Sequence, residues 1–192
     1  MTTTPVADQL AALEKEIMEK TQRAHELRRQ MPAEKVRDHV LEGPDGPVKL
    51  SDLFGDEKDL LVVHNMGKSC PYCTLWADGL NGLVDHIQSR TAFVVVSPDE
   101  PATQKAFAAS RGWRFRMLSD GDEFTETMGF EHEQDGKTRY APGFSTFRKH
   151  GDGTIERVAS SWFGPGDLYC SVWHLFEHLE GGTGEWQPKF SY

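Results

Sequence analysis

Residues 59–76 read DLLVVHNMGKSCPYCTLW and contain the clearest signals of the fold in this sequence. Its apolar first part, residues 59–65, has the length of a buried strand. From Cys70 to Gln88 the apolar residues recur at helical spacing, at Leu75, Trp76, Leu80, Leu83, Val84 and Ile87. The stretch therefore predicts a strand followed directly by a helix, with Cys70 and Cys73 in the first helical turn.

The same alternation continues towards the C-terminus. It predicts further strands at residues 91–97 and 115–118, and further helices at residues 101–111 and 122–128. Continuous apolar strands that alternate with helices are typical of a parallel sheet.

Turn sequences on either side of this region predict antiparallel strands. Strands at residues 143–148 and 154–160 flank His150-Gly-Asp-Gly153, and we expect this pair to join the sheet. Before the first buried strand, the turn Gly43-Pro-Asp-Gly-Pro47 predicts a short hairpin. A last helix is expected over residues 167–180, ending before Gly181.

Residues 7–31 predict one long helix that ends at Pro32. Its apolar residues keep a heptad spacing at Leu10, Ile17, Ala24 and Met31, with a second series at Leu13 and Leu27 that Lys20 interrupts. Such a stripe packs either on the chain's own core or against a second copy, and a homodimer is the assembly we expect. The order of elements predicts an α/β, thioredoxin-like fold with a central mixed sheet flanked by helices, residues 33–192, after an N-terminal helical arm, residues 1–32.

The Cys70-Pro71-Tyr72-Cys73 dithiol is the main candidate site. Unsatisfied N–H groups and a partial positive charge at a helix N-terminus stabilise a thiolate. We therefore expect Cys70 to be the nucleophile and Cys73, one turn further on, to be the resolving thiol. Pro71 loses no hydrogen bond at this position, and Lys68 adds positive potential nearby.

Pro142 is the second candidate. It precedes the predicted strand at residues 143–148, which is where a thioredoxin fold has a proline that faces the dithiol. An ordinary X–Pro bond is usually trans. In this fold context we expect Pro142 to be cis and to shape the substrate groove.

Composition excludes several classes of function. Over its 192 residues the chain has a formal net charge of −9, which argues against general nucleic-acid binding. The longest apolar runs, residues 60–63 and 92–96, are far shorter than the roughly 20 residues that span a bilayer, and residues 1–10 lack the apolar region of a signal peptide. Three cysteines are too few for a disulfide-stapled secreted scaffold, so we expect a cytoplasmic protein without membrane contact or cofactor.

Cys170, His174 and His178 recur every four residues in the predicted last helix and form a Cys-His stripe. The opposite face, Leu168, Val172, Leu175, Phe176 and Leu179, is expected to contact the core. A Cys-His set can bind zinc or copper, and Cys70 and Cys73 can in principle complete such a site. We favour an ordinary polar surface instead, with no metal.

Three further features have weaker interpretations. His64, near the end of the first buried strand, can approach the dithiol but more often makes an ordinary hydrogen bond. Asp78 can accept a proton, although a solvated helix face suits it better. The aromatic tail, residues 186–192, is expected to cover exposed sheet.

The chain resembles a bacterial family of thioredoxin-like proteins of unknown function, grouped near the alkyl hydroperoxide reductase and thiol-specific antioxidant proteins. The resemblance covers nearly the whole chain. Its most specific segments are residues 14–32, 43–46 with 54–55, 70–79 and 186–192. It implies a thioredoxin-like fold and a thiol role, without a substrate.

Two better-understood groups share fragments of the sequence. Cys-Pro-Tyr-Cys is also the glutaredoxin dithiol, but Ala141-Pro142-Gly143 stands where those proteins have a glutathione-binding Thr-Val-Pro element. Peroxiredoxins have a threonine three residues before the reactive cysteine, and Gly67 occupies that position here. Both departures argue against a dedicated member of either group.

The function expected from the sequence is thiol–disulfide exchange with a protein or small-molecule disulfide. A thiol-dependent hydroperoxide reductase is the alternative enzyme. The alternative without catalysis is a metal-binding or interaction module on the same scaffold.

Overall fold

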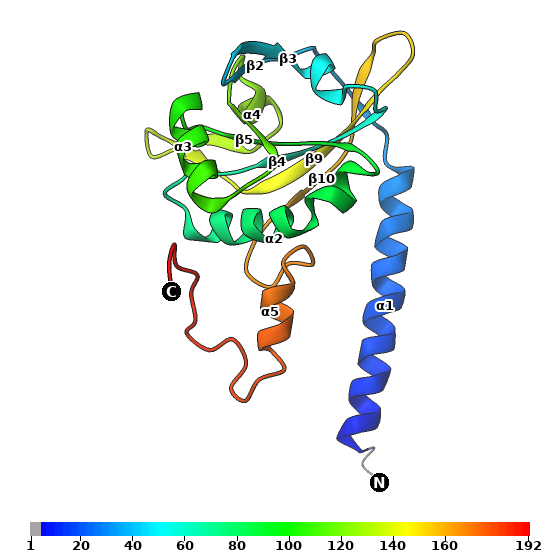
Figure 1. Cartoon of the computed structure of the whole chain (residues 1–192). Helices are drawn as coiled ribbons and strands as arrows, with labels where there is room; N and C mark the ends of the chain where they lie inside the picture. The colour runs from blue at the N-terminus through cyan, green and yellow to red at the C-terminus, as the bar shows by residue number, and fades with distance from the viewer. Residues whose placement is uncertain (1–4) are drawn as a thin grey trace. The chain divides into compact units, whose positions relative to one another are not determined.

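The computed structural model describes residues 5–192 and divides the chain into two compact units, Met1–Ala33 and Glu34–Tyr192 (Figure 1). The first unit contains one helix, α1 (Val6–Gln30), which ends before Pro32 as the sequence predicts. No side chain of α1 is buried, and its heptad residues Leu10, Leu13, Ile17 and Leu27 are about half exposed.

The second unit is built on an eight-stranded mixed sheet with the strand order β1-β10-β9-β4-β5-β6-β2-β3. The central strands β4 (Asp59–His64), β5 (Ala92–Ser97) and β6 (Arg116–Ser119) are parallel. The remaining strands pair antiparallel, and they are β1 (Glu34–Val36), β2 (Val40–Gly43), β3 (Gly46–Lys49), β9 (Gly143–Lys149) and β10 (Ile155–Trp162). The predicted thioredoxin-like α/β fold with a central mixed sheet is confirmed.

Both faces of the central strands are buried, because their side chains alternate between two apolar clusters. Leu60 and Val62 of β4 pack in one cluster with Phe124 of α4 (Phe124–Thr127) and with the 3-10 helix Leu50–Phe54. Val63 packs in the other cluster with Trp76 of α2 (Pro71–Gln88). Burial on two faces explains why these strands read as continuous apolar runs.

Helices α2, α3 (Pro101–Arg111) and α5 (Ser171–Phe176) supply the second cluster, and α2 lies along one face of the sheet (Figure 1). The predicted boundaries of α2 and α3 agree with the structure within one residue. In residues 5–192 no helix combines the length and apolarity that crossing a bilayer requires.

The prediction of the last helix is wrong in length. Instead of residues 167–180, only Ser171–Phe176 is helical, and turns and a bend follow to Glu185. Strand β1 and the separate hairpin β7 (Glu131–Gln134)–β8 (Lys137–Tyr140) were not predicted. Both hairpin strands are polar and mostly exposed, so they lack the apolar alternation that identifies a strand.

Candidate active site

The loop between β4 and α2 places the dithiol at the C-terminal end of the central strand β4. The Asn65 side chain accepts a hydrogen bond from the N–H of Gly67 (2.8 Å), and the carbonyl of Gly67 accepts one from the N–H of Cys70 (3.1 Å). Gly67 has a φ of +100°, and a Cβ there would lie 3.0 Å from a carboxylate oxygen of Asp99. Glycine is therefore required at the position where peroxiredoxins have threonine.

Cys70 is the N-cap residue of α2, and its sulfur replaces the usual capping oxygen. The backbone N–H of Cys73 donates to Cys70 Sγ over 3.0 Å. Pro71, the first helical residue, has no N–H to leave unpaired. The N–H and the hydroxyl of Thr74 both donate to the Cys70 carbonyl, which anchors the first turn.

The two thiols have opposite pKa shifts. The pKa of Cys70 is lowered from 9.0 to about 7, chiefly by a hydrogen bond from the Cys73 thiol and further by the backbone N–H groups of Cys73 and Tyr72, against the effect of burial. The pKa of Cys73 is raised well above its ordinary value by the same thiol–thiol hydrogen bond, by burial and by the nearby Cys70 charge. The favoured state near neutral pH is thus a Cys70 thiolate beside a Cys73 thiol.

The accessible surface of the two cysteines differs in the same direction as their acidity. Cys70 keeps 9% of its surface accessible and Cys73 keeps 3%, and both are free thiols. Both cysteines are buried, and the less buried residue is also the more acidic one, which is the order that a nucleophile and a resolving thiol need.

The positive charge of Lys68, expected to act near Cys70, is not among the causes that lower the pKa of Cys70. Lys68 is exposed, its backbone N–H donates to Asp99, and the lowered pKa of Cys70 comes from hydrogen bonds. Asp78 is likewise occupied: its carboxylate pairs with Arg111 and accepts a hydrogen bond from the indole N–H of Trp113 (2.8 Å). Asp78 therefore joins α2 to the end of α3.

His64 is buried at the end of β4, and it is one of the residues that line a narrow space together with Cys73 and Pro142. Its Nε2 lies 3.0 Å from Ser145 Oγ, and its ring stacks on Phe130 with centroids 4.0 Å apart. Burial, with a smaller effect from the charge of Arg157, lowers its pKa to about 3. A neutral imidazole in this position contributes to packing.

Pro142 lies beside the resolving thiol, because it lines a narrow space together with Cys73, Trp76 and Phe163. The expectation of a cis bond is wrong: the structure has no cis peptide bond between residues 5 and 192. The trans form is the intrinsically favoured one, and it is compatible here with two flanking hydrogen bonds. Ala141 N–H donates to the Phe130 carbonyl (2.8 Å), and Phe163 N–H donates to the Pro142 carbonyl (2.9 Å).

The Cys-His stripe does not form a metal site. Across residues 5–192, no three His, Cys, Asp or Glu side chains are grouped so that they can hold a metal ion. Cys170 is buried, His174 Nε2 donates to the Asp167 carbonyl (2.8 Å), and His178 lies beyond the end of α5. The prediction that the leucine face of this helix contacts the core is also wrong. Leu168, Leu175 and Leu179 are mostly exposed, whereas Cys170 and Trp173 are buried.

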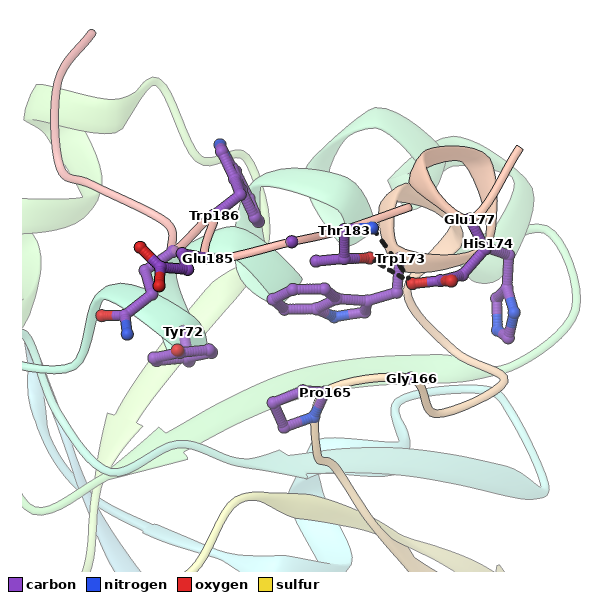
Figure 2. A pocket seen from close by; sticks show the side chains of 11 residues that line it. Tyr72, Pro165, Gly166, Trp173, His174, Glu177, Thr183, Glu185 and Trp186 are labelled. Atoms are coloured by element: carbon purple, nitrogen blue, oxygen red, sulfur yellow. Dashed lines mark hydrogen bonds between the residues drawn. The ribbon is translucent and has the colours of Figure 1, made fainter. Parts of the chain in front are cut away.

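A pocket of about 830 Å³ reaches the first turn of α2 at Tyr72, with neither cysteine among its lining residues, and sequence reasoning missed it (Figure 2). One of its walls is Tyr72, which lies between Pro71 and Cys73 in the motif. Trp173 of α5 and Trp186 of the tail form the other aromatic walls. The tail packs on helices rather than on the sheet, since Trp186 contacts Phe176 and Phe190 contacts Phe107.

Solved structures with a similar fold are peroxiredoxins. Peroxidoxin BcpB from Mycobacterium tuberculosis superposes with a TM-score of 0.55 at 23% identity, covering 68% of this chain and 84% of that one. Reduced Prx3 from Vibrio vulnificus, in complex with hydrogen peroxide, superposes with a TM-score of 0.55 at 19% identity, covering 72% of this chain and 88% of that one. A PrxQ variant from Xylella fastidiosa superposes with a TM-score of 0.55 at 18% identity, covering 68% of this chain and 83% of that one. At these identities the likeness concerns the fold.

Sequence comparison supplies the family. A search of curated proteins found no significant match. The family model described as "Bacterial protein of unknown function (DUF899)" matches residues 5–189, which include both the helical arm and the dithiol. The chain therefore belongs to the DUF899 family, in agreement with the resemblance noted in its sequence.

Proposed function

We propose that this protein is a thiol–disulfide oxidoreductase in which Cys70 is the nucleophile and Cys73 the resolving thiol. The observation that carries the proposal is the hydrogen bond that Cys70 Sγ accepts from the Cys73 N–H at 3.0 Å, together with the lowered pKa of Cys70. This donor stabilises an anion on the less buried of the two cysteines. The proposed setting is the cytoplasm, where a close cysteine pair is kept reduced and available.

The reaction has two exchange steps. The Cys70 thiolate attacks one sulfur of a substrate disulfide, a mixed disulfide forms, and the other substrate sulfur leaves as a thiolate that takes up a proton. Cys73 then loses its proton and attacks Cys70 Sγ, which releases the second substrate thiol and leaves a Cys70–Cys73 disulfide. The substrate is reduced by two electrons, and an external dithiol must return them to the protein.

The raised pKa of Cys73 is compatible with the second step. Its largest cause is the hydrogen bond to the Cys70 sulfur, and the Cys70 charge adds to it. Both disappear once Cys70 is a neutral sulfur in a mixed disulfide. The pKa of Cys73 should therefore be lower in the mixed disulfide than in the resting state, although burial continues to raise it.

Hydroperoxide reduction is the second candidate, and the similarity to peroxiredoxin folds favours it. In that reaction Cys70 would be oxidised to a sulfenic acid and Cys73 would condense with it, releasing water. The first turn offers little to orient a peroxide, because Gly67 lacks a hydroxyl and the Thr74 hydroxyl donates to the Cys70 carbonyl.

Thiol trapping with mass spectrometry across a glutathione redox series tests the proposal, together with turnover of insulin disulfides. We expect a Cys70–Cys73 bridge and insulin reduction, and we expect both to vanish in Cys70→Ser. Cys170→Ser is the matched control, because Cys170 also precedes a helix but caps no N–H and has a raised pKa. Peroxide consumption without insulin reduction would favour the second candidate.

A further inference from the structure

The pocket walled by Tyr72, Trp173 and Trp186 has a size that suits a substrate, and it meets the dithiol motif at Tyr72, although neither cysteine lines it. Its volume of about 830 Å³ lies in the range of small-molecule sites. Tyr72 is part of its wall and sits between the nucleophile and the resolving thiol in the chain. A molecule bound here is next to the first turn of α2.

Aromatic rings form three sides of this pocket. Tyr72 stacks on Trp173 with ring centroids 6.0 Å apart and planes inclined by 16°. Trp186 meets Trp173 nearly edge-on at 5.3 Å and an interplanar angle of 71°. Figure 2 shows Trp173 between Trp186 and Pro165, with Tyr72 beside Pro165. Electron-rich aromatic faces in such an arrangement attract a cation.

The charged side chains of the pocket are acidic. Glu177 and Glu185 line it, and the other lining residues include neither lysine nor arginine. The Glu177 carboxylate is fixed by Thr183, whose hydroxyl and N–H donate to it over 2.6 and 3.2 Å (Figure 2). These hydrogen bonds also lower the pKa of Glu177, so that it is ionised at neutral pH. His174, the histidine of the pocket, is hydrogen-bonded to the Asp167 carbonyl.

We propose that this pocket binds the cationic end of a small disulfide substrate, an ammonium or guanidinium group close to the S–S bond, and so selects cationic disulfides for reduction by Cys70. The inference rests on the proposed function. It adds a substrate class that the dithiol alone does not specify, because the sulfur chemistry is the same for any disulfide.

Three symmetrical disulfides of similar length test the selection: cystamine, which is cationic, bis-hydroxyethyl disulfide, which is neutral, and dithiodiglycolate, which is anionic. For each disulfide, kcat/KM is divided by the rate constant for its reduction by free dithiothreitol at the same pH and ionic strength. This ratio corrects for differences in intrinsic reactivity among the three disulfides. We expect cystamine to exceed the neutral disulfide about tenfold, and the anionic disulfide to be the poorest. Equal normalised values, or a preference for the anion, would overturn the inference.

Variants separate the pocket from the overall charge of the protein. Glu177→Gln and Trp186→Leu should each reduce the ratio of the normalised kcat/KM of cystamine to that of the neutral disulfide by about threefold to tenfold. Glu133→Gln is the matched control, since Glu133 accepts a hydrogen bond from Thr138 (2.6 Å) in the β7–β8 hairpin outside the pocket. An equal loss in Glu133→Gln would assign the preference to the net charge and contradict the pocket.

Binding without turnover separates this inference from the proposed function. In Cys70→Ser, cystamine should change the tryptophan fluorescence at a lower concentration than bis-hydroxyethyl disulfide, and Trp186→Leu should abolish the difference. If the wild-type protein reduces none of the three disulfides but this binding difference remains, the exchange function fails and the cation site stands. If turnover occurs without any binding difference, the cation site fails and the exchange function stands.

Discussion

The backbone N–H of Cys73 donates to the sulfur of Cys70 over 3.0 Å, so the resolving residue stabilises the nucleophile with its main chain as well as with its thiol. The two cysteines therefore titrate as a pair. The first proton leaves from Cys70 and the second is retained on Cys73.

Alkylation kinetics can measure this pairing. The rate of Cys70 modification by iodoacetamide should rise with a midpoint near pH 7, since only the thiolate reacts. Cys73→Ala removes the largest cause of the shift and should move the midpoint upward, whereas Cys73→Ser keeps a hydroxyl donor and should move it less. Cys170→Ser should leave the midpoint unchanged. An unshifted midpoint in Cys73→Ala would show that the thiol contributes nothing.

The buried His64 predicts a loss of stability in acid. Its pKa is about 3 in the folded protein and 6.5 when unperturbed, so the unfolded chain binds a proton more readily between these values. The stabilisation is complete above pH 6.5 and is lost as the pH falls towards 3, by up to about 1.4 kcal/mol per pH unit.

The variant His64→Gln isolates this contribution, because glutamine can still hydrogen-bond Ser145 but does not titrate. The difference in unfolding free energy between the wild-type protein and His64→Gln should narrow from pH 6.5 downward in urea titrations. A constant difference over that range would mean that His64 is not neutral in the folded state.

Asp78 is predicted to be structural rather than a proton acceptor. Asp78→Ala leaves the Trp113 indole N–H and the Arg111 guanidinium without their carboxylate, and we expect a loss of about 1–3 kcal/mol. The control on the same helix is Asp85→Ala, whose partner Arg114 is exposed and whose loss should be below about 1 kcal/mol. Urea unfolding measures both, and the alkylation midpoint of Cys70 should be unchanged in each.

We propose that the heptad stripe of α1 pairs with the same helix of a second copy. None of the side chains of α1 is buried in the monomer, although a seven-residue apolar repeat is typical of a helix with a partner. Ile17→Glu should convert a dimer into a monomer in sedimentation or light scattering. Met18→Glu adds the same charge one residue off the stripe and should leave the dimer intact. A monomeric wild-type protein would refute the pairing.

The sequence predicts the dithiol and its surroundings well because the signals are local. Apolar runs identify β4 and β5, and the helical spacing from Cys70 onward identifies α2 almost to the residue. The cap by Cys70 then follows from its place before Pro71. Each of these features depends on residues within a single turn or strand.

The features that sequence reasoning missed depend on distant partners. Trp173 is buried because Tyr72 and Trp186 lie against it, and neither contact is visible in the spacing of α5. The same packing reverses the expected facing of the Cys-His stripe. The β7–β8 hairpin has no apolar face, so its strands leave no periodic signal.

Tyr72 belongs at once to the redox motif and to the wall of the neighbouring pocket. A ligand of this pocket that binds the dithiol and disulfide forms with different affinity would link occupancy of the pocket to the oxidation state of the protein. A ligand with tenfold higher affinity for the dithiol form would lower the tendency of the protein to become oxidised by about 30 mV. By reciprocity, oxidation of the dithiol would weaken the affinity for that ligand tenfold. Such a change would favour release of the reduced product.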